Sequence, residues 1–354
     1  MTDPMANNAV AAADSAPRKL GTLEVGRGLA ALAVVMHHAS QASDAFTAPD
    51  HAGMFVWGLY GVDFFFVLSG FIIYHVHQND PRRIGAAQRF LIKRLRRIYV
   101  PYLPITVVLI SAYLILPGFP QGNRDWGWFT SLTLLPSDAP PALSVAWTLT
   151  FEMIFYLFFL SFFVTRYFRH LVLGWVLLVL VIAGFGLNDT LSNPLSRTLL
   201  DPLILEFVAG MAAAHYFGKL QLAHWYAPLI LGGRGVLLFA LLPDPHRAVL
   251  GVSIGPVVLG LALAEERFRI RTPKVLVLLG AASYAIYLIH NPLQSLVGRA
   301  LQGADNWLLT FAVCCAASVT AGILYHLIYE RPMLRLLSRK RRVNIETAHL
   351  DHQR

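Results

Sequence analysis

Four ionisable side chains lie inside apolar stretches of this sequence, where they could carry out acid–base chemistry. His38, Asp63, Glu152 and His290 each stand within such a run. Ionisable groups are costly inside a membrane and mark candidate functional sites. Two imidazoles and two carboxylates at one depth are the groups needed to take a proton from a hydroxyl. We therefore predict that the four meet, and a buried structural network is the alternative reading of the same residues.

The spacing of Arg27 and His38 favours His38 as the reactive histidine. Eleven residues separate the two, which on an α-helix is three turns plus about 20°, so both lie on one face about 16 Å apart along the axis. His37 points about 80° away from that face. The alternative is a packed histidine with an arginine whose charged end reaches the membrane surface.

Further polar side chains share helical faces with these groups. Tyr156 follows Glu152 by one turn. Ser283, Tyr287 and His290 lie at positions i, i+4 and i+7, so they form one stripe. The stripe indicates that a polar surface on this segment faces the predicted site.

A basic run at 89–97, followed by Pro101, contains Arg94 and Arg97. Positively charged cytoplasmic loops and anionic lipid explain such a run in any membrane protein. The functional alternative is a binding site for a polyanionic cytosolic ligand.

Ser69, beside Gly70, offers a hydroxyl for a covalent intermediate, although small residues in a membrane helix more often permit close packing.

The composition indicates an all-α, polytopic integral membrane protein. Of the 354 residues, 56% are hydrophobic and 14% are charged, against about 25% charged in soluble domains. Spans need about 20 apolar residues each, and ten such runs are present. They lie near 22–42, 54–77, 99–117, 145–164, 171–187, 199–217, 225–242, 247–264, 275–298 and 306–329. The seventh is the weakest, because it contains Gly232, Gly233, Arg234 and Gly235, and we expect it to be short, broken or tilted.

The distribution of basic residues predicts which segments face the cytoplasm. With a cytoplasmic N-terminus, 24 of the 29 Lys and Arg residues fall on the inside. The outer loops hold only Arg124, Arg197, Arg247 and Arg299, and Arg234 lies within the seventh run. This asymmetry predicts that both termini are cytoplasmic and that the number of spans is even. The charge of +9 then reflects topology and does not indicate nucleic-acid binding.

Three segments follow from these patterns: a disordered cytoplasmic lead at 1–19, a membrane domain at 20–335 and a basic cytoplasmic tail at 336–354. The two cysteines, Cys314 and Cys315, are adjacent. They lack the spacing of a metal site, and we predict none.

Several of these motifs, in this order, resemble acyltransferase family 3, which consists of membrane proteins. The resemblance covers residues 20 to 335. The motifs are the Arg27 and His38 pair, 61–63 with 69–71, the basic run ending at Pro101, 147–152, Ser283 and Tyr284 with Tyr287 and His290, and 330–332. The chain is most similar to bacterial O-acetylases of exopolysaccharide and O-antigen. Many members carry a second acidic residue after the glutamate, where this chain has Met153, so Glu152 stands alone.

The resemblance implies transfer of an acyl group, usually acetyl, from cytosolic acetyl-CoA to a hydroxyl of a glycan or lipid-linked saccharide at a bacterial inner membrane. No permanently bound cofactor is implied, and membrane lipid and polysaccharide assembly proteins are candidate partners. His38 would act as general base, oriented or charge-balanced by Glu152 or Asp63. Arg27, Arg94, Arg97 and Ser69 would bind the donor. The acceptor would be bound by Tyr156, Ser283, Tyr284, Tyr287 and His290. Direct transfer and a covalent intermediate both remain open.

Two other functional classes fit part of the pattern. A glycan or proton-coupled transporter could use the same buried carboxylates. A non-catalytic membrane partner in polysaccharide assembly would tolerate substitution of His38.

Overall fold

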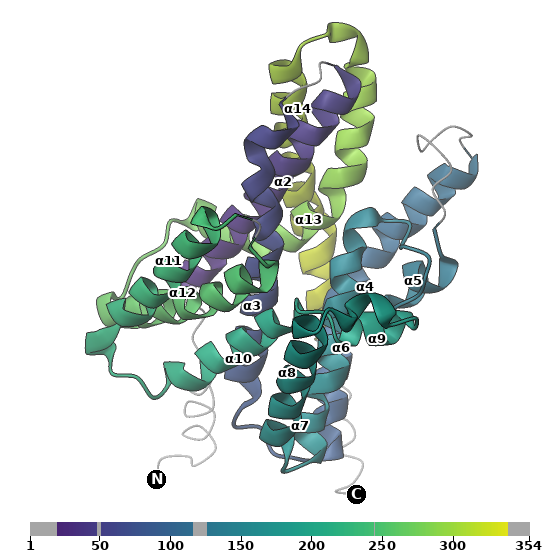
Figure 1. Cartoon of the computed structure of the whole chain (residues 1–354). Coiled ribbons are helices and arrows are strands. Elements are labelled where there is room, and N and C mark those ends of the chain that lie inside the picture. Colours follow the sequence, from purple (N-terminus) through teal and green to yellow (C-terminus); the bar gives the residue numbers. More distant parts are fainter. Residues whose placement is uncertain (1–19, 48–50, 116–125, 244, 339–354) are drawn as a thin grey trace, which may run out of the picture.

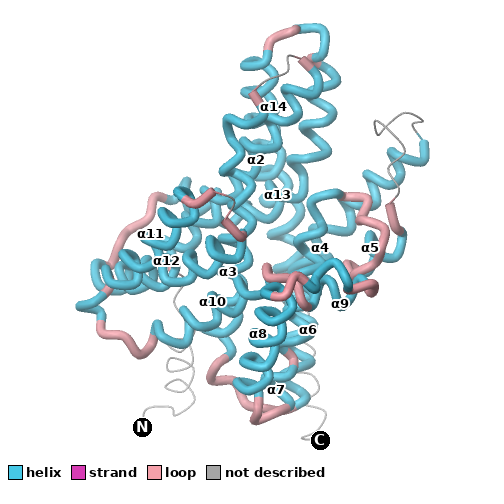
Figure 2. Tube along the Cα trace, in the orientation of Figure 1, coloured by secondary structure: helices cyan, strands magenta, loops and turns pink. Residues whose placement is uncertain are grey.

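A computed structural model describes residues 20–47, 51–115, 126–243 and 245–338. In this part of the chain, helices are joined by loops and turns and strands are absent (Figure 2). The all-α prediction is confirmed. The predicted lead at 1–19 and most of the predicted tail, 339–354, lie outside the described residues.

Each of the ten apolar runs forms a helix (Figure 1). They are α2 (Gly21–Phe46), α3 (Gly61–His77), α4 (Ile84–Ile115), α6 (Trp147–Phe159) with α7 (Ser161–Val164), α8 (Phe168–Gly184), α10 (Ile204–Phe217), α11 (Tyr226–Leu241), α12 (Arg247–Phe268), α13 (Lys274–Ala300) and α14 (Trp307–Tyr325). Shorter helices, α5 (Trp128–Thr133) and α9 (Pro194–Leu199), lie in connections. A helix satisfies every backbone polar group internally, which a bilayer demands.

Seven of the described helical segments are long and apolar enough to cross a membrane, which supports a multi-pass membrane protein. They are 53–77, 84–115, 144–164, 194–217, 247–268, 274–300 and 307–338. Of the other runs, α2 has 26 residues but carries several polar and charged groups, whereas α8 and α11 have 17 and 16 residues. Ten spans and cytoplasmic termini therefore stay predictions.

The basic run belongs to a helix and is not a loop before one. α4 begins at Ile84, so Arg94 and Arg97 stand on the same helix as the apolar residues that follow. Pro101 and Pro104 lie inside α4 without ending it. The Tyr325 hydroxyl donates to the Pro101 carbonyl at 2.8 Å, which ties this part of α4 to α14.

The glycines of the seventh run do not break it. α11 is continuous, and Gly232 and Gly235 lie against Ser253 on α12. A Cβ at Gly232 would lie 2.6 Å from the Ser253 carbonyl oxygen. These glycines allow two helix backbones to approach closely, as small residues do in membranes.

Close packing holds together the helices that carry the predicted site residues. Gly280 on α13 abuts the backbone of Glu24 on α2, with no space for a Cβ between them. Between α3, α6 and α10, Phe207 stacks on Phe66 at 4.7 Å and on Phe155 at 4.5 Å, measured between ring centroids. Such contacts fix the relative positions of the helices that carry the predicted residues.

Candidate active site

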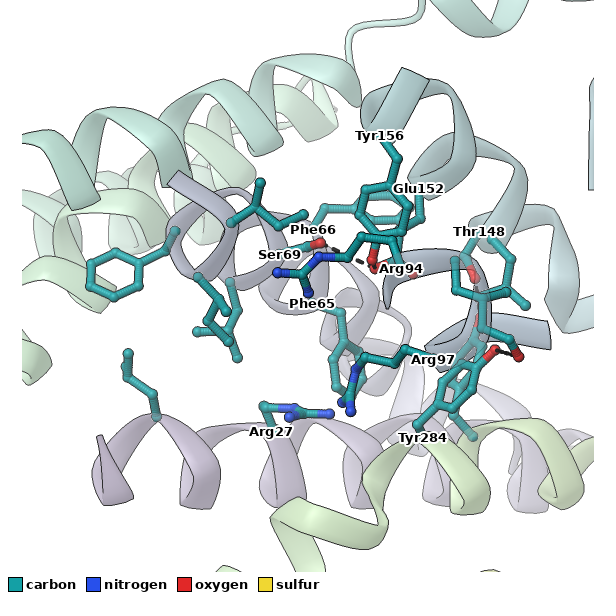
Figure 3. A pocket seen from close by; sticks show the side chains of 18 of the residues that line it. Arg27, Phe65, Phe66, Ser69, Arg94, Arg97, Thr148, Glu152, Tyr156 and Tyr284 are labelled. Carbon is teal, nitrogen blue, oxygen red and sulfur yellow. Dashed lines mark hydrogen bonds between the residues drawn. The ribbon is translucent and has the colours of Figure 1, made fainter. Parts of the chain in front are cut away.

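A cavity of about 400 Å³ lies between α2, α3, α4, α6 and α13 (Figure 3). We call it the arginine cavity. It is lined by eight of the twelve predicted site residues: Arg27, Ser69, Arg94, Arg97, Glu152, Tyr156, Tyr284 and Tyr287. The volume falls within the range of small-molecule sites. The structure thus brings the four predicted donor-binding residues together.

Three guanidinium groups face this cavity from two helices (Figure 3). Arg27 on α2 pairs with Glu24 at 3.5 Å. Arg94 lies over the rings of Phe90 and Tyr156, at 5.7 and 5.9 Å from the centroids. Its Nε is buried and has no hydrogen-bond partner among the described residues. A buried donor normally has a partner, and an anionic ligand would supply one here.

Glu152 is held in the arginine cavity by two hydroxyl groups. The Ser69 hydroxyl donates to Glu152 Oε1 at 3.1 Å, and the Tyr156 hydroxyl donates to the same oxygen. Gly70, and not Ser69, makes the close helix contact, because an added Cβ at Gly70 would collide with the Phe207 carbonyl. Ser69 is therefore a polar part of the cavity wall.

His38 lines a different cavity, of about 260 Å³, which we call the histidine cavity. Its other walls include Gln41, Ser144, Asn291, Gln294 and Arg299. On α2, α4 and α13, later turns line the histidine cavity and earlier turns line the arginine cavity. The two cavities therefore lie toward opposite ends of the same three helices.

The hydrogen bonds of His38 assign its tautomer. His290 Nδ1 donates to the Tyr287 carbonyl at 2.7 Å, which leaves His290 Nε2 as an acceptor. His38 Nδ1 lies 3.3 Å from that nitrogen and 3.1 Å from the Val34 carbonyl. Both neighbours accept, so His38 Nδ1 carries the proton and His38 Nε2 keeps its lone pair. His38 is therefore arranged to accept a proton.

One helical turn separates the cavities. Thr148 lines the arginine cavity and Ser144 the histidine cavity, while on α13 Tyr287 and Asn291 divide in the same way. The Tyr287 hydroxyl lies 3.0 Å from Thr148 Oγ1 and donates to the Val145 carbonyl at 3.0 Å. The side chains of Tyr287 and Thr148, together with His290, form the wall between the two cavities.

Asp63 does not join the histidines or Glu152, contrary to the predicted meeting of four groups. It is fully buried and forms a two-pronged ion pair with Arg247, at 2.9 Å from Nε and 2.8 Å from Nη2. A guanidinium matches a carboxylate in this geometry. Sequence alone assigned Arg247 to an outer loop and gave no sign of the pair.

The predicted orienting partner of His38 is also different. Its ring contacts the side chain of His290 and the carbonyl of Val34, whereas Glu152 lines the other cavity. The expected cluster is thus divided into a histidine pair, a carboxylate with two hydroxyls, and an ion pair.

The residues predicted to bind an acceptor are dispersed. Tyr156, Tyr284 and Tyr287 line the arginine cavity, while Ser283 and His290 are fully buried and line neither cavity. Sequence reasoning missed Gln41, which lies one turn beyond His38. It also missed the face of α13 that continues from Asn291 to Arg299. Steps of three or four residues along the helix from His38 and from Tyr287 would have found both.

Comparisons with known proteins agree on one family. The model of an acyltransferase domain matches residues 20–327. The exopolysaccharide production protein ExoZ of Rhizobium meliloti (strain 1021) is 32% identical over 318 residues, covering 83% of this chain and 95% of that protein. The acyltransferase MdmB of Streptomyces mycarofaciens is 28% identical over 375 residues, covering 92% and 94%. No solved structure matches the chain. The chain belongs to acyltransferase family 3.

Proposed function

We propose that this acyltransferase moves an acetyl group from cytosolic acetyl-CoA to a hydroxyl of an exopolysaccharide or a related glycan. The observation that carries the proposal is the pair of cavities that meet at one wall, with His38 beside that wall. A relative named for exopolysaccharide production supports a polysaccharide acceptor.

The arginine cavity would bind the donor. Arg27, Arg94 and Arg97 supply three positive charges, while the acidic side chains among the described lining residues are Glu24 and Glu152. The surplus charge suits the phosphates of coenzyme A, and guanidinium groups bind phosphate in a two-pronged manner. Glu152 would hold Tyr156 and Ser69 in place. Since Ser69 lies in this cavity and not beside His38, we propose direct transfer without an acylated serine.

His38 would act as the general base. Its Nε2 takes the proton of the acceptor hydroxyl while that oxygen attacks the thioester carbonyl. The C–O ester bond forms, the C–S bond breaks, and the leaving thiolate takes the proton back from the imidazolium. His290 would fix the tautomer through its contact with His38 Nδ1. The acetyl end would reach His38 past Tyr287 and Thr148, whose hydroxyl groups would have to separate.

The proposed topology follows from the same division. With ten crossings and both termini in the cytoplasm, the arginine cavity would face the cytosol and the histidine cavity the outer side of a bacterial inner membrane. Most Lys and Arg residues fall in the segments that this topology places inside, as the positive-inside rule requires.

The test is replacement of His38 by alanine in a strain that depends on this chain for O-acetylation. We expect acetate on the extracellular polysaccharide, measured by NMR, to fall by about 10²-fold or more. His37→Ala is the matched control, since His37 lines neither cavity. Unchanged acetylation with normal protein levels would end the proposal. Export of intact glycan that depends on Glu152, without transfer from acetyl-CoA by the purified protein, would instead indicate a transporter.

A further inference from the structure

Gln294 lines the histidine cavity and carries a buried oxygen atom without a partner. The residue is 1% exposed. Its Nε2 donates to the Val35 carbonyl at 3.0 Å, whereas its Oε1 has no hydrogen-bond partner among the described residues. An unsatisfied buried acceptor costs free energy, so a ligand that donates to this oxygen would bind favourably.

The contact with Val35 determines which chemical group can satisfy Gln294. A carbonyl only accepts hydrogen bonds, so the end of the Gln294 amide that meets the Val35 carbonyl is its nitrogen. The other end is the oxygen, which also only accepts. A ligand hydroxyl can donate to it, whereas an ether oxygen, a carboxylate or a phosphate dianion cannot. The missing partner is therefore a group that carries a hydrogen.

Gln294 and His38 are anchored at adjoining points of α2. Gln294 binds the Val35 carbonyl, and the carbonyl before it, that of Val34, accepts from His38 Nδ1 at 3.1 Å. On α13, Gln294 follows His290 by four residues, so both lie on one face of the helix. His290 in turn contacts the His38 ring at 3.3 Å. Because Gln294 and His38 also line the same cavity, one ligand can meet both.

A hydrogen-bond donor lines the same cavity. The Ser144 hydroxyl donates to Asn291 Oδ1 at 3.2 Å, which leaves the Asn291 amide nitrogen to donate to a ligand. A hydroxyl both donates and accepts. An amide oxygen on Gln294 and an amide nitrogen on Asn291 therefore suit a ligand with several hydroxyl groups.

We propose that Gln294 is a specificity-determining residue that requires a second hydroxyl on the acceptor sugar. One hydroxyl meets His38 Nε2, loses its proton and is acetylated. Another hydroxyl of the same sugar unit donates to Gln294 Oε1 and stays free. This inference rests on the proposed acyl transfer and adds the residue that selects the acceptor.

The test uses the sugar unit that carries acetate in the wild-type polysaccharide, as identified by NMR. Its methyl glycoside and the set of monodeoxy methyl glycosides serve as acceptors for the purified full chain with radiolabelled acetyl-CoA. Removal of the acetylated hydroxyl abolishes transfer in any mechanism. Removal of the hydroxyl that meets Gln294 should lower kcat/KM about ten-fold or more, equivalent to about 1.4 kcal/mol, although that hydroxyl is never acetylated.

Gln294→Leu should remove this preference. We expect kcat/KM for the complete glycoside to fall to that for the deoxy glycoside, while the KM for acetyl-CoA, which binds in the other cavity, stays the same. Gln294→Glu should keep the preference, because a carboxylic acid can donate to the Val35 carbonyl and still accept from the sugar. Gln78→Leu is the matched control, since Gln78 also donates to a backbone carbonyl but lines neither cavity.

Two results with folded protein would overturn the inference. One is a wild-type chain that uses every deoxy glycoside with an intact acetylation position as well as the complete one. The other is a preference that persists in Gln294→Leu or disappears in Gln294→Glu. If the wild-type chain acetylates isolated polysaccharide but no methyl glycoside, the inference fails and the proposed function does not. If it neither binds nor uses acetyl-CoA, the proposed function fails and the inference fails with it.

Discussion

At the scale of single residues, Asp63 and Glu152 show how environment separates two carboxylates. Asp63 is fully buried and paired with Arg247, so its charge is neutralised inside the helix bundle. Glu152 instead accepts hydrogen bonds from two hydroxyl groups in a cavity. Only the second arrangement leaves a carboxylate beside space for a ligand. We therefore assign Asp63 a structural part and Glu152 a part in the donor site.

This assignment predicts the behaviour of the ion pair. Arg247→Ala leaves the Asp63 charge buried without its partner, so we expect a loss of about 3–5 kcal/mol of stability, seen as a large drop in unfolding temperature in detergent. The double variant Asp63→Asn with Arg247→Gln removes both charges, so much of the stability should return and O-acetylation should persist. A double variant that is as stable as the wild type yet inactive would show that Asp63 takes part in the chemistry.

The position of a site residue could be predicted from the sequence where the geometry of a single helix determines it. It could not be predicted where the packing of two helices determines it. The angular spacing of residues around α2 was enough to favour His38 over His37. His38 lines a cavity in the structure. The Asp63–Arg247 pair joins α3 to α12 across 184 positions of sequence. The pair forms only at one rotation and register of the two helices. These depend on how the helices pack, which the apolar pattern of either helix does not define. The division of the four predicted groups was missed for the same reason.

At the scale of elements, close helix packing sets the positions of the site residues. α2 carries both Arg27 and His38, and α13 carries both Tyr287 and His290. The contact of Gly280 with the Glu24 backbone brings these two helices together. A small shift here would move His38 relative to His290.

Gly280→Ala should therefore disturb both stability and activity. The added methyl group meets backbone and cannot be accommodated by a side-chain rotation, so we expect a cost of about 1–3 kcal/mol, measured by thermal unfolding. Gly233→Ala on α11 is the control, since nothing lies within 4 Å of its Cβ position. Equal unfolding temperatures for the two variants would contradict the packing account.

The existence of the helices was predictable, but their limits were not. Long apolar runs in a membrane can form little except helix, and all ten runs did so. The start of α4 was missed because the apolar run begins only after the basic residues 89–97, although Lys and Arg are good helix formers. The glycines of the seventh run predicted a short, broken or tilted helix. α11 is short, with 16 residues, but it is not broken, and the packing partner of its glycines, Ser253, stands on a different helix.

At the scale of the whole molecule, one helix bundle contains two cavities that lie toward its opposite ends. A donor and an acceptor from different sides of a membrane could approach one wall without sharing a compartment. The thin layer at Tyr287 and Thr148 would keep the sides apart when the site is empty.

This arrangement predicts different accessibility for the two cavities. Ser295 lines the histidine cavity. Starting from a chain with Cys314 and Cys315 replaced by alanine, Ser295→Cys should react with a membrane-impermeant maleimide added outside the cell. His75→Cys should react only in inverted membrane vesicles, because His75 lines the arginine cavity. Labelling of both positions from the same side would contradict the proposed orientation.

In the proposed mechanism, the donor reaches the His38 imidazole from one cavity and the acceptor reaches it from the other. The most direct test is a cryo-electron microscopy structure of the full chain with an acetyl-CoA analogue whose thioester sulfur is replaced by a methylene group. We predict phosphate oxygens about 3 Å from the guanidinium groups of Arg27, Arg94 or Arg97. The acyl carbonyl carbon should lie within about 5 Å of His38 Nε2, which leaves space for a hydroxyl about 3 Å from that carbon. An acyl group that stays in the arginine cavity, with Tyr287 still closing the wall, would contradict the proposed mechanism.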